Sequence, residues 1–417
     1  MRILHIHKSF KKNTTDGSLS ALLETKKLLE KKGHTVIIFS TKDKKNLKTE
    51  YAKYFPKNFN YNEIKSFFKK IYYLPKVFYN LEAKKNLETL IKKEKPQIAH
   101  LHSLHFYLSP SIIDVLKKYN IPIIHKLPTY QLFCPNYRFF TQGKICEKCK
   151  GGKFYHCALN KCLKNSFKVS LVAVLEAYFS GIFKFYQKVD LFLAPSLFMQ
   201  KKAIEHGLAP NKVKLLRNVF NFDQIKPDYQ NKNYFLYYGL IAEEKGIESL
   251  ILAVNRLKKA RKLGQNKLKI AGNGPKKQEY QKIVKNLGLK EEIKFVPNLA
   301  KGSTEWKNLI KEAKFVTIPS IWYENSPNTA TEAMAFGKPV IVSNCGGSPE
   351  MIENHKSGFI FEAGNSKALA QKIDQLLKDP KKIKQMGQAV RKRAETINNE
   401  ERYYEKLISF YKALANR

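Results

Sequence analysis

The stretch that decides the fold is FVTIPSIWYENSPNTATEAMAFGKPVIVSNCGGSPE, residues 315–350. Residues 315–318 and 340–342 are short apolar runs, which are typical of buried strands. A helical pattern separates the two runs, and Gly337-Lys338-Pro339 ends it. The stretch therefore predicts two successive strand–loop–helix turns of a parallel α/β sheet.

Each predicted helix has a recognisable start. Ser326 is expected to cap the first helix and Pro327 to occupy its first position, where the missing N–H costs nothing. After Gly346-Gly347, the residues Ser348-Pro349-Glu350 predict a second start. Both helices would present free backbone N–H groups at one sheet edge, which is a favourable site for an anion such as a diphosphate.

Two glutamates belong to this stretch. Glu324 lies in the loop before the first predicted helix, and Glu332 lies between one and two turns inside it. Since carboxylates repel phosphates, these side chains are better suited to accept hydrogen bonds from a ribose and a hexose. A solvated loop charge and a solvated helix charge would show the same spacing, so spacing leaves both interpretations open.

The surrounding motifs resemble those of a known family, the retaining nucleotide-sugar glycosyltransferases of family 4, which have two Rossmann-like domains (the GT-B fold). The resemblance covers nearly the whole chain and is strongest from residue 237 to residue 364. Its motifs are Pro319-Ser320, Glu324-Asn325-Ser326-Pro327, Thr331-Glu332-Ala333-Met334-Ala335, Gly337-Lys338-Pro339-Val340-Ile341, and Cys345-Gly346-Gly347 with Glu350. It implies that Glu324 contacts the donor sugar and Glu332 the ribose. The other implied donor-binding residues of the stretch are Asn325, Ser326, Pro327, Gly346 and Gly347.

Earlier segments fit the same donor site. Lys245 occupies the position of a lysine that grips the diphosphate in the resembled family, so Lys245 and Glu324 are the predicted catalytic residues. Gly272 and Gly274 permit close approach to the backbone, and the nucleotide base is expected near Val296. Gly17 is the one glycine kept in a first loop that in the family is usually glycine-rich and lies against the donor phosphates.

Two positions depart from the family pattern. An arginine usually shares the diphosphate with the lysine, but Leu240 stands there, and Arg217 at the end of a nearby predicted strand is a candidate replacement. A His-Asp pair usually precedes the Cys-Pro motif, but Pro128-Thr129 stand there. His125 lies three residues too early on a strand that rises about 3.3 Å per residue. No catalytic histidine is therefore assigned.

Five of the six cysteines fall in one segment, at Cys134, Cys146, Cys149, Cys157 and Cys162. Cys146-Glu-Lys-Cys149 has metal-ligand spacing, Cys134 and Cys162 complete a tetrahedral thiolate set, and His156 and Cys157 are competing ligands. A subset of the resembled family carries Cys-Pro, Cys-x-x-Cys and Lys-Cys in this order, which supports part of the set. We expect a structural zinc at Cys134, Cys146, Cys149 and Cys162 and no catalytic metal. Reduced thiols and redox or cluster chemistry remain alternatives, whereas a cytosolic location disfavours disulfides.

The charge balance is strongly basic, with 76 Lys and Arg against 35 Asp and Glu, a net charge of +41. This field favours anionic partners, such as a phosphorylated donor or an anionic membrane surface, although a coding bias toward lysine would give the same count. We found no nucleic-acid recognition motif and expect no nucleic acid partner.

The N-terminus is a strand without the features of a signal peptide. The longest apolar run, residues 169–186, is interrupted by Glu176 and Lys184, which predicts a buried or membrane-surface helix rather than a span. We expect a cytoplasmic protein, peripheral on the inner face of the membrane.

The domain organisation follows from the order of these segments. The opening strand–helix–strand is of Rossmann type, and the aromatic and basic segment 41–95 suits a membrane-facing surface, an acceptor cleft or an ordinary amphipathic helix. His100, His102 and His105 follow a predicted strand and are candidates for lining the cleft. The predicted parts are a first, acceptor domain (1–220) with a Cys-rich insertion (134–162), a linker (221–232), a donor domain (233–397), and a helix (398–417) that returns to the first domain.

These observations predict an α/β fold of GT-B type, with two Rossmann-like domains. The predicted function is retaining transfer of a hexose-type sugar from a UDP- or GDP-sugar to a hydroxyl of a glycan or lipid-linked acceptor, in cell-surface polysaccharide or glycolipid synthesis. Because no Asp-x-Asp occurs, metal-independent catalysis is expected. Two alternatives stay open. One is a catalytically degenerate sugar-nucleotide-binding protein or partner subunit, and the other is a basic membrane-surface or nucleic-acid-binding protein.

Overall fold

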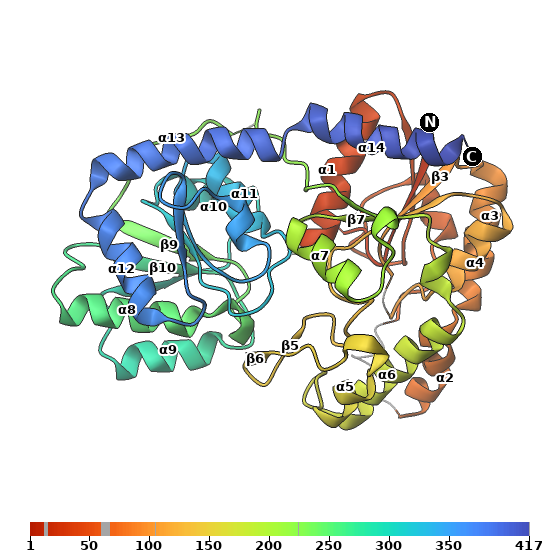
Figure 1. Cartoon of the computed structure of the whole chain (residues 1–417), viewed down its shortest axis with the longest axis horizontal. Coiled ribbons are helices and arrows are strands. Elements are labelled where there is room, and N and C mark those ends of the chain that lie inside the picture. The colour runs from red at the N-terminus through yellow and green to blue at the C-terminus, as the bar shows by residue number, and fades with distance from the viewer. Residues whose placement is uncertain (12–15, 60–66, 105, 224, 417) are drawn as a thin grey trace. The chain divides into compact units, whose positions relative to one another are not determined.

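The computed structural model describes residues 1–417 except 12–15, 60–66, 105, 224 and 417. Its contacts divide the chain into two units (Figure 1). Unit 1 is Met1–Thr141, Cys146–Val219 and Glu400–Arg417, and unit 2 is Gln142–Ile145 and Phe220–Asn399. The domain boundaries predicted from the sequence lie at residues 220 and 398. The predicted linker, residues 221–232, belongs to unit 2 apart from the undescribed residue 224.

Unit 1 is built on a parallel sheet with the strand order β2-β1-β3-β4-β7-β8. The strands are β1 (Arg2–His7), β2 (Thr35–Phe39), β3 (Ile98–Ser103), β4 (Ile123–Lys126), β7 (Leu191–Ala194) and β8 (Val213–Leu215). The α-helices are α1 (Gly17–Lys31), α2 (Phe67–Phe78), α3 (Leu81–Glu94), α4 (Ser111–Lys118), α5 (Tyr155–Leu159), α6 (Phe167–Ile182), α7 (Leu197–Glu205) and α14 (Glu400–Ala415). The short elements of unit 1 are β5 (Phe140–Thr141), η1 (Glu50–Tyr54), η3 (Lys150–Gly152), η4 (Phe185–Lys188) and η5 (Pro210–Lys212), whereas β6 (Lys144–Ile145) belongs to unit 2.

Unit 2 is built on a second parallel sheet, ordered β11-β10-β9-β12-β13-β14. Its strands are β9 (Tyr234–Tyr238), β10 (Lys267–Ala271), β11 (Ile293–Val296), β12 (Val316–Ile318), β13 (Val340–Ser343) and β14 (Gly358–Phe361). Its helices are η6 (Glu243–Lys245), α8 (Ile247–Lys259), α9 (Lys277–Asn286), α10 (Thr304–Lys311), α11 (Asn328–Ala335), η7 (Ser348–Met351), α12 (Ser366–Leu377) and α13 (Pro380–Ile397).

The core of unit 2 has a layer on each face of the sheet. Alternate residues of a strand point to opposite faces, and β9 shows this directly. Phe235 and Tyr237 pack with α8, α9 and α12, whereas Tyr234, Leu236 and Tyr238 pack with α10, α11 and α13. Figure 1 shows α8 and α9 on one side of the sheet and α10 and α11 on the other. The expected three-layer α/β architecture of this domain is confirmed.

The helix starts predicted after β12 and β13 differ from the structure. Pro327 is the extended N-cap of α11 and makes no side-chain capping bond, and α11 begins at Asn328. The prediction of a Ser326 cap was therefore wrong by one residue. The second start gives only η7, a short 3-10 turn over Ser348–Met351, instead of an α-helix.

The prediction for His105 lies outside the described residues, as does part of the segment 41–95. Within the described part of the chain, none of the helices combines the length and the apolar character needed to span a membrane.

Candidate functional site

The candidate site of unit 2 lies where the chain reverses its direction of winding. β9 is followed outward by β10 and β11 on one side, while β12, β13 and β14 continue on the other. In open parallel sheets, ligands bind outside the carboxyl ends of the strands at such a switch point. The loop after β9 contains Lys245 and the loop after β12 contains Glu324, so both predicted catalytic residues lie at this point.

Glycines allow the loops at this edge to interlock. Gly246 has a φ of +64°, and a Cβ there would lie 2.0 Å from the carbonyl oxygen of Pro319. Gly346 has a φ of +65°, and its Cβ would lie 2.2 Å from the carbonyl oxygen of Glu324. Both distances are far below van der Waals contact, and both backbone conformations disfavour side chains. These two glycines thus hold the loop of Glu324 between its neighbours.

The glycines predicted to permit close approach, Gly272 and Gly274, pack tightly against backbone. A Cβ at Gly272 would lie 1.9 Å from the oxygen of Gly239, and one at Gly274 would lie 2.2 Å from the oxygen of Ile241. Ile241 also donates its N–H to Asn273 at 2.9 Å. The loops after β9 and β10 are therefore packed against each other at the sheet edge.

Glu324 and Lys245 form a buried ion pair. The Lys245 Nζ donates to Glu324 Oε1 at 2.7 Å, and the Ser320 hydroxyl donates to the same oxygen at 2.7 Å. Glu324 is 6% exposed, and the Lys245 ammonium lies 4.8 Å from the ring centroid of Trp322. Burial raises the pKa of the Glu324 carboxyl, but Lys245 and Ser320 outweigh burial and leave the pKa lowered. Glu324 is thus held as a carboxylate.

Glu332 is a second buried carboxylate paired with a lysine, and the sequence did not reveal this pairing. It lies on α11, is 4% exposed, and accepts from Lys301 Nζ at 2.6 Å through Oε1. Here burial is the larger influence, so the pKa of the Glu332 carboxyl is raised although Lys301 lowers it. The interpretation of Glu324 and Glu332 as solvated charges was wrong, because both side chains are buried.

The other predicted donor residues surround these pairs. Gly347 donates its N–H to the Glu324 carbonyl at 2.6 Å. Asn325 and Ser326 follow Glu324 and are half-buried, Pro327 is buried, and Val296 ends β11 half-buried. Gly17 is the first residue of α1 in unit 1, where the Asp16 side chain caps the helix.

The departures from the family pattern lie in both units. Leu240, at the usual arginine position, is 49% exposed. Arg217 and Pro128-Thr129 belong to unit 1.

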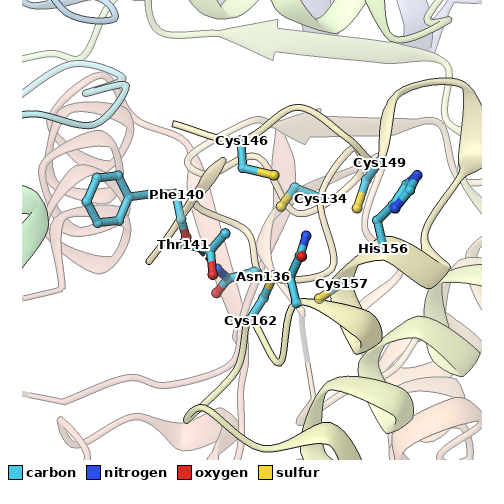
Figure 2. A pocket seen from close by; sticks show the side chains of 10 residues that line it. Cys134, Asn136, Phe140, Thr141, Cys146, Cys149, His156, Cys157 and Cys162 are labelled. Carbon is cyan, nitrogen blue, oxygen red and sulfur yellow. Dashed lines mark hydrogen bonds between the residues drawn. The ribbon is translucent and has the colours of Figure 1, made fainter. Parts of the chain in front are cut away.

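The predicted metal ligands of unit 1 line one small cavity. Cys134, Cys146, Cys149 and Cys162 lie around it together with Cys157 and His156 (Figure 2). All six cysteines of the chain are free thiols, and burial raises the pKa of Cys134 to about 11 and that of Cys149 to about 12. Among the described residues, the group of three metal-ligand atoms that all lie within 4.8 Å of one another is not here but at His5, His100 and His102.

The three histidines lie side by side in the interior of unit 1. His5 on β1 pairs in register with His100 on β3, and all three side chains are buried. The rings of His100 and His102 are stacked, with centroids 4.3 Å apart and an interplanar angle of 19°. Nitrogen lone pairs lie in the ring plane, so two nearly parallel stacked rings cannot direct them at one ion. The expectation that His100 and His102 line a cleft was wrong, and their geometry does not favour a metal.

Much of unit 2 matches a family of known proteins. Residues 219–393 match the family Glycosyl transferases group 1. The chain is 34% identical over 149 residues to the uncharacterized glycosyltransferase MJ1607 of Methanocaldococcus jannaschii, covering 36% of this chain and 37% of that protein. It is 26% identical over 252 residues to the amylovoran biosynthesis glycosyltransferase AmsK of Erwinia amylovora, covering 58% and 61%. The matched segments thus span less than two thirds of these relatives.

A solved structure extends the likeness of fold to almost the whole chain. Anabaena Alr3699/HepE in complex with UDP superposes with a TM-score of 0.63 at 16% identity, covering 99% of this chain and 100% of that one. The chain therefore has two Rossmann-like domains of the GT-B fold, and its residues 219–393 are a Glycosyl transferases group 1 domain.

Proposed function

We propose that the protein is a retaining glycosyltransferase of family 4. It transfers a hexose-type sugar from a UDP- or GDP-sugar to a hydroxyl of a glycan or lipid-linked acceptor, in cell-surface polysaccharide or glycolipid synthesis. The name of its relative AmsK and the UDP bound by HepE support this acceptor class and donor class.

One observation carries the proposal. Unit 2 contains two buried carboxylates, Glu324 and Glu332, and each is paired with a lysine. Glu324 and Lys245 lie at the switch point of the sheet. An ionised carboxylate accepts hydrogen bonds and donates none. Glu332 is therefore suited to bind ribose hydroxyls, and Glu324 to bind sugar hydroxyls. Lys245 supplies the cation that a leaving diphosphate needs. A nucleotide-sugar contains all three complementary groups.

The chemistry of the transfer step falls mainly to Lys245. As the bond between sugar and phosphate breaks, negative charge grows on the phosphate oxygen, and a fixed cation there lowers the barrier. Lys245 lies next to Trp322 and Glu324, so its ammonium is already oriented before the donor binds. The absence of Asp-x-Asp supports catalysis without a metal clamp, and retention with front-face attack is carried from the family resemblance.

We also propose that this cytoplasmic enzyme works at the inner face of an anionic membrane. In unit 1, α2, α5 and α6 share one apolar cluster, yet large apolar side chains on or next to them remain exposed. These are Phe68 (82%), Tyr72 (67%), Leu159 (64%), Ile182 (74%) and Phe183 (54%). Apolar side chains beside a strongly basic charge balance suit an anionic lipid surface.

A structural zinc in the Cys-rich segment remains part of the proposal. The thiol set has the chemistry of a zinc site. Backbone groups of Asn136, Arg138 and Phe139 oppose, but do not outweigh, the rise that burial gives to the pKa of Cys134. The four cysteines line one small cavity. Zinc would fix this segment and take no part in the transfer.

The test of the main proposal is a panel of UDP- and GDP-sugars, scored by thermal shift and by release of nucleoside diphosphate. Glu332→Ala should weaken nucleotide binding, and Glu324→Ala should mainly impair transfer. Lys245→Ala should slow release by about 10²–10³-fold, as expected for the loss of one charge-stabilising donor. Glu312→Ala, a change at a half-exposed glutamate of the same unit, is the control.

Unchanged kinetics in both Glu324→Ala and Glu332→Ala would contradict the site. Binding of a nucleotide-sugar without any release, in the presence of glycan and lipid-linked acceptors, would favour the degenerate binding protein. The departures at Leu240 and Pro128 make this the alternative to exclude.

A further inference from the structure

The pair of Lys301 and Glu332 is asymmetric. The Glu332 side chain is 5% exposed and fixed on α11, whereas the Lys301 side chain is 41% exposed and lies on the segment between β11 and α10. A half-exposed lysine contributes little to stability through such a pair. The pair matters more for the ionisation of Glu332, because a buried carboxylate without a nearby cation tends to take up a proton.

The protonation state of Glu332 decides what it can bind. An ionised carboxylate accepts hydrogen bonds with both oxygens, whereas a protonated one also donates and accepts fewer. A ribose presents hydroxyl donors, so it binds more strongly to the ionised form, which offers more acceptor sites. Burial raises the pKa of Glu332, and Lys301 is the charged group that opposes this rise.

The neighbouring elements offer no other cation at the Glu332 carboxylate among the described residues. Tyr238 on β9 is a neutral neighbour whose hydroxyl donates to the Thr329 carbonyl. Arg391 on α13 donates to the carbonyl of Ala335 at the other end of α11. The strands β12 and β13, against which α11 packs, present no titratable side chain, and Glu350 on η7 is an anion.

We propose that Lys301 is a positioning residue of the nucleotide subsite: its ammonium keeps the buried Glu332 carboxylate ionised and oriented as the acceptor for a ribose hydroxyl. This role rests on the proposed function. If Glu332 must be ionised to bind ribose well, nucleotide affinity depends on pH. Lys301, which belongs to no recognised sequence motif, sets the pH range of that dependence.

The test compares Lys301→Met with Lys311→Met. Lys311 is a matched control, because it is 45% exposed and pairs with Asp228 at 3.3 Å in the same unit. Binding of UDP and GDP is measured by calorimetry from pH 5.5 to pH 8.5 at constant ionic strength. Loss of a nearby opposite charge raises a carboxyl pKa by about one unit or more. Lys301→Met should therefore shift the acid limb of the affinity profile upward by about one pH unit and lose about tenfold in affinity on that limb. Its affinity should recover toward wild type at pH 8.5.

Glu332→Gln should abolish this acid limb, and Lys311→Met should leave it unchanged. Carboxyl carbon-13 NMR, with the Glu332 signal assigned by Glu332→Gln, gives the protonation of Glu332 directly and should show the same shift in Lys301→Met. An unchanged profile, or tighter binding at every pH, would overturn the role of Lys301. A wild-type protein that binds neither UDP nor GDP would overturn the proposed function itself, which is a separate outcome.

Discussion

At the scale of single residues, Lys126 is the most unusual side chain of unit 1. It ends β4, is 2% exposed, and its Nζ has no hydrogen-bond partner in the described part of the chain. Burial lowers its pKa to about 8. The buried histidines His5, His100 and His102 feel its charge. An ammonium in such surroundings destabilises the folded state.

Lys126→Met should therefore stabilise unit 1. The folded pKa of Lys126 lies below the ordinary lysine value of 10.5, so the penalty is complete below about pH 8 and disappears as pH rises toward 10.5. We expect a gain of about 1–3 kcal/mol at pH 7 and little at pH 10.5. Thermal and urea unfolding at both pH values measure it.

Lys338→Met is the matched comparison in unit 2. Lys338 is also buried, at 1% exposed, but its Nζ donates to Asn231 Oδ1 at 2.8 Å and to the Gln230 carbonyl at 3.3 Å. Removing the ammonium deletes both of these hydrogen bonds from a charged donor, so this variant should lose about 1–3 kcal/mol. Equal effects of the two substitutions would contradict the distinction between them.

At the scale of elements, spacing predicted strands better than helix starts. The strands around the quoted stretch were found because buried parallel strands are short, continuous apolar runs. The start of α11 was misplaced because the Ser-Pro pattern favours a cap at Ser326, whereas the backbone reaches helical geometry only at Asn328. The Gly-Gly-Ser-Pro start was recognised, but the chain leaves helical geometry after one 3-10 turn.

Among the elements, the Cys-rich segment is the one whose stability we expect a bound metal to affect most. If it holds zinc, freshly purified reduced protein should contain about one zinc per chain, and Cys146→Ser should lose it. Cys345→Ser removes a buried cysteine of unit 2 and should retain the zinc. Chelation should lower the melting temperature of wild type but not of Cys146→Ser. Elemental analysis without zinc in the reduced wild type would remove the metal from this segment.

At the scale of the whole molecule, the charge of +41 is the dominant feature. A charge of this size acts at a distance and is screened within about 10 Å at 0.1 M salt. Binding to an anionic surface should therefore be salt-sensitive unless apolar contacts add to it. The exposed side chains at the end of α6 are suited to make such contacts.

Vesicle co-sedimentation tests the electrostatic and the apolar contributions to membrane binding. The protein should bind vesicles of phosphatidylglycerol and phosphatidylcholine, and less so phosphatidylcholine alone. Ile182→Ser combined with Phe183→Ser should weaken binding by about tenfold or more, since each buried apolar side chain contributes about 1.5–3 kcal/mol. Leu252→Ser, at an exposed leucine of unit 2, should have no effect. Equal binding to both vesicle types would contradict an anionic surface as the partner.

The sequence by itself determined the fold class, the switch-point loops and the types of residue they present. Apolar runs specify strands, and Gly346 marks the turn before a predicted helix start because few other residues adopt its backbone conformation. Tertiary structure alone decided which charges meet. Lys245 is 79 residues from Glu324, and Lys301 is one of 76 basic residues in the chain. No local pattern encodes a pairing of that kind, because it depends on how several loops pack at one sheet edge. Burial of Glu324, Glu332 and Lys126 followed from the same packing, and burial is what sets their protonation and their chemistry.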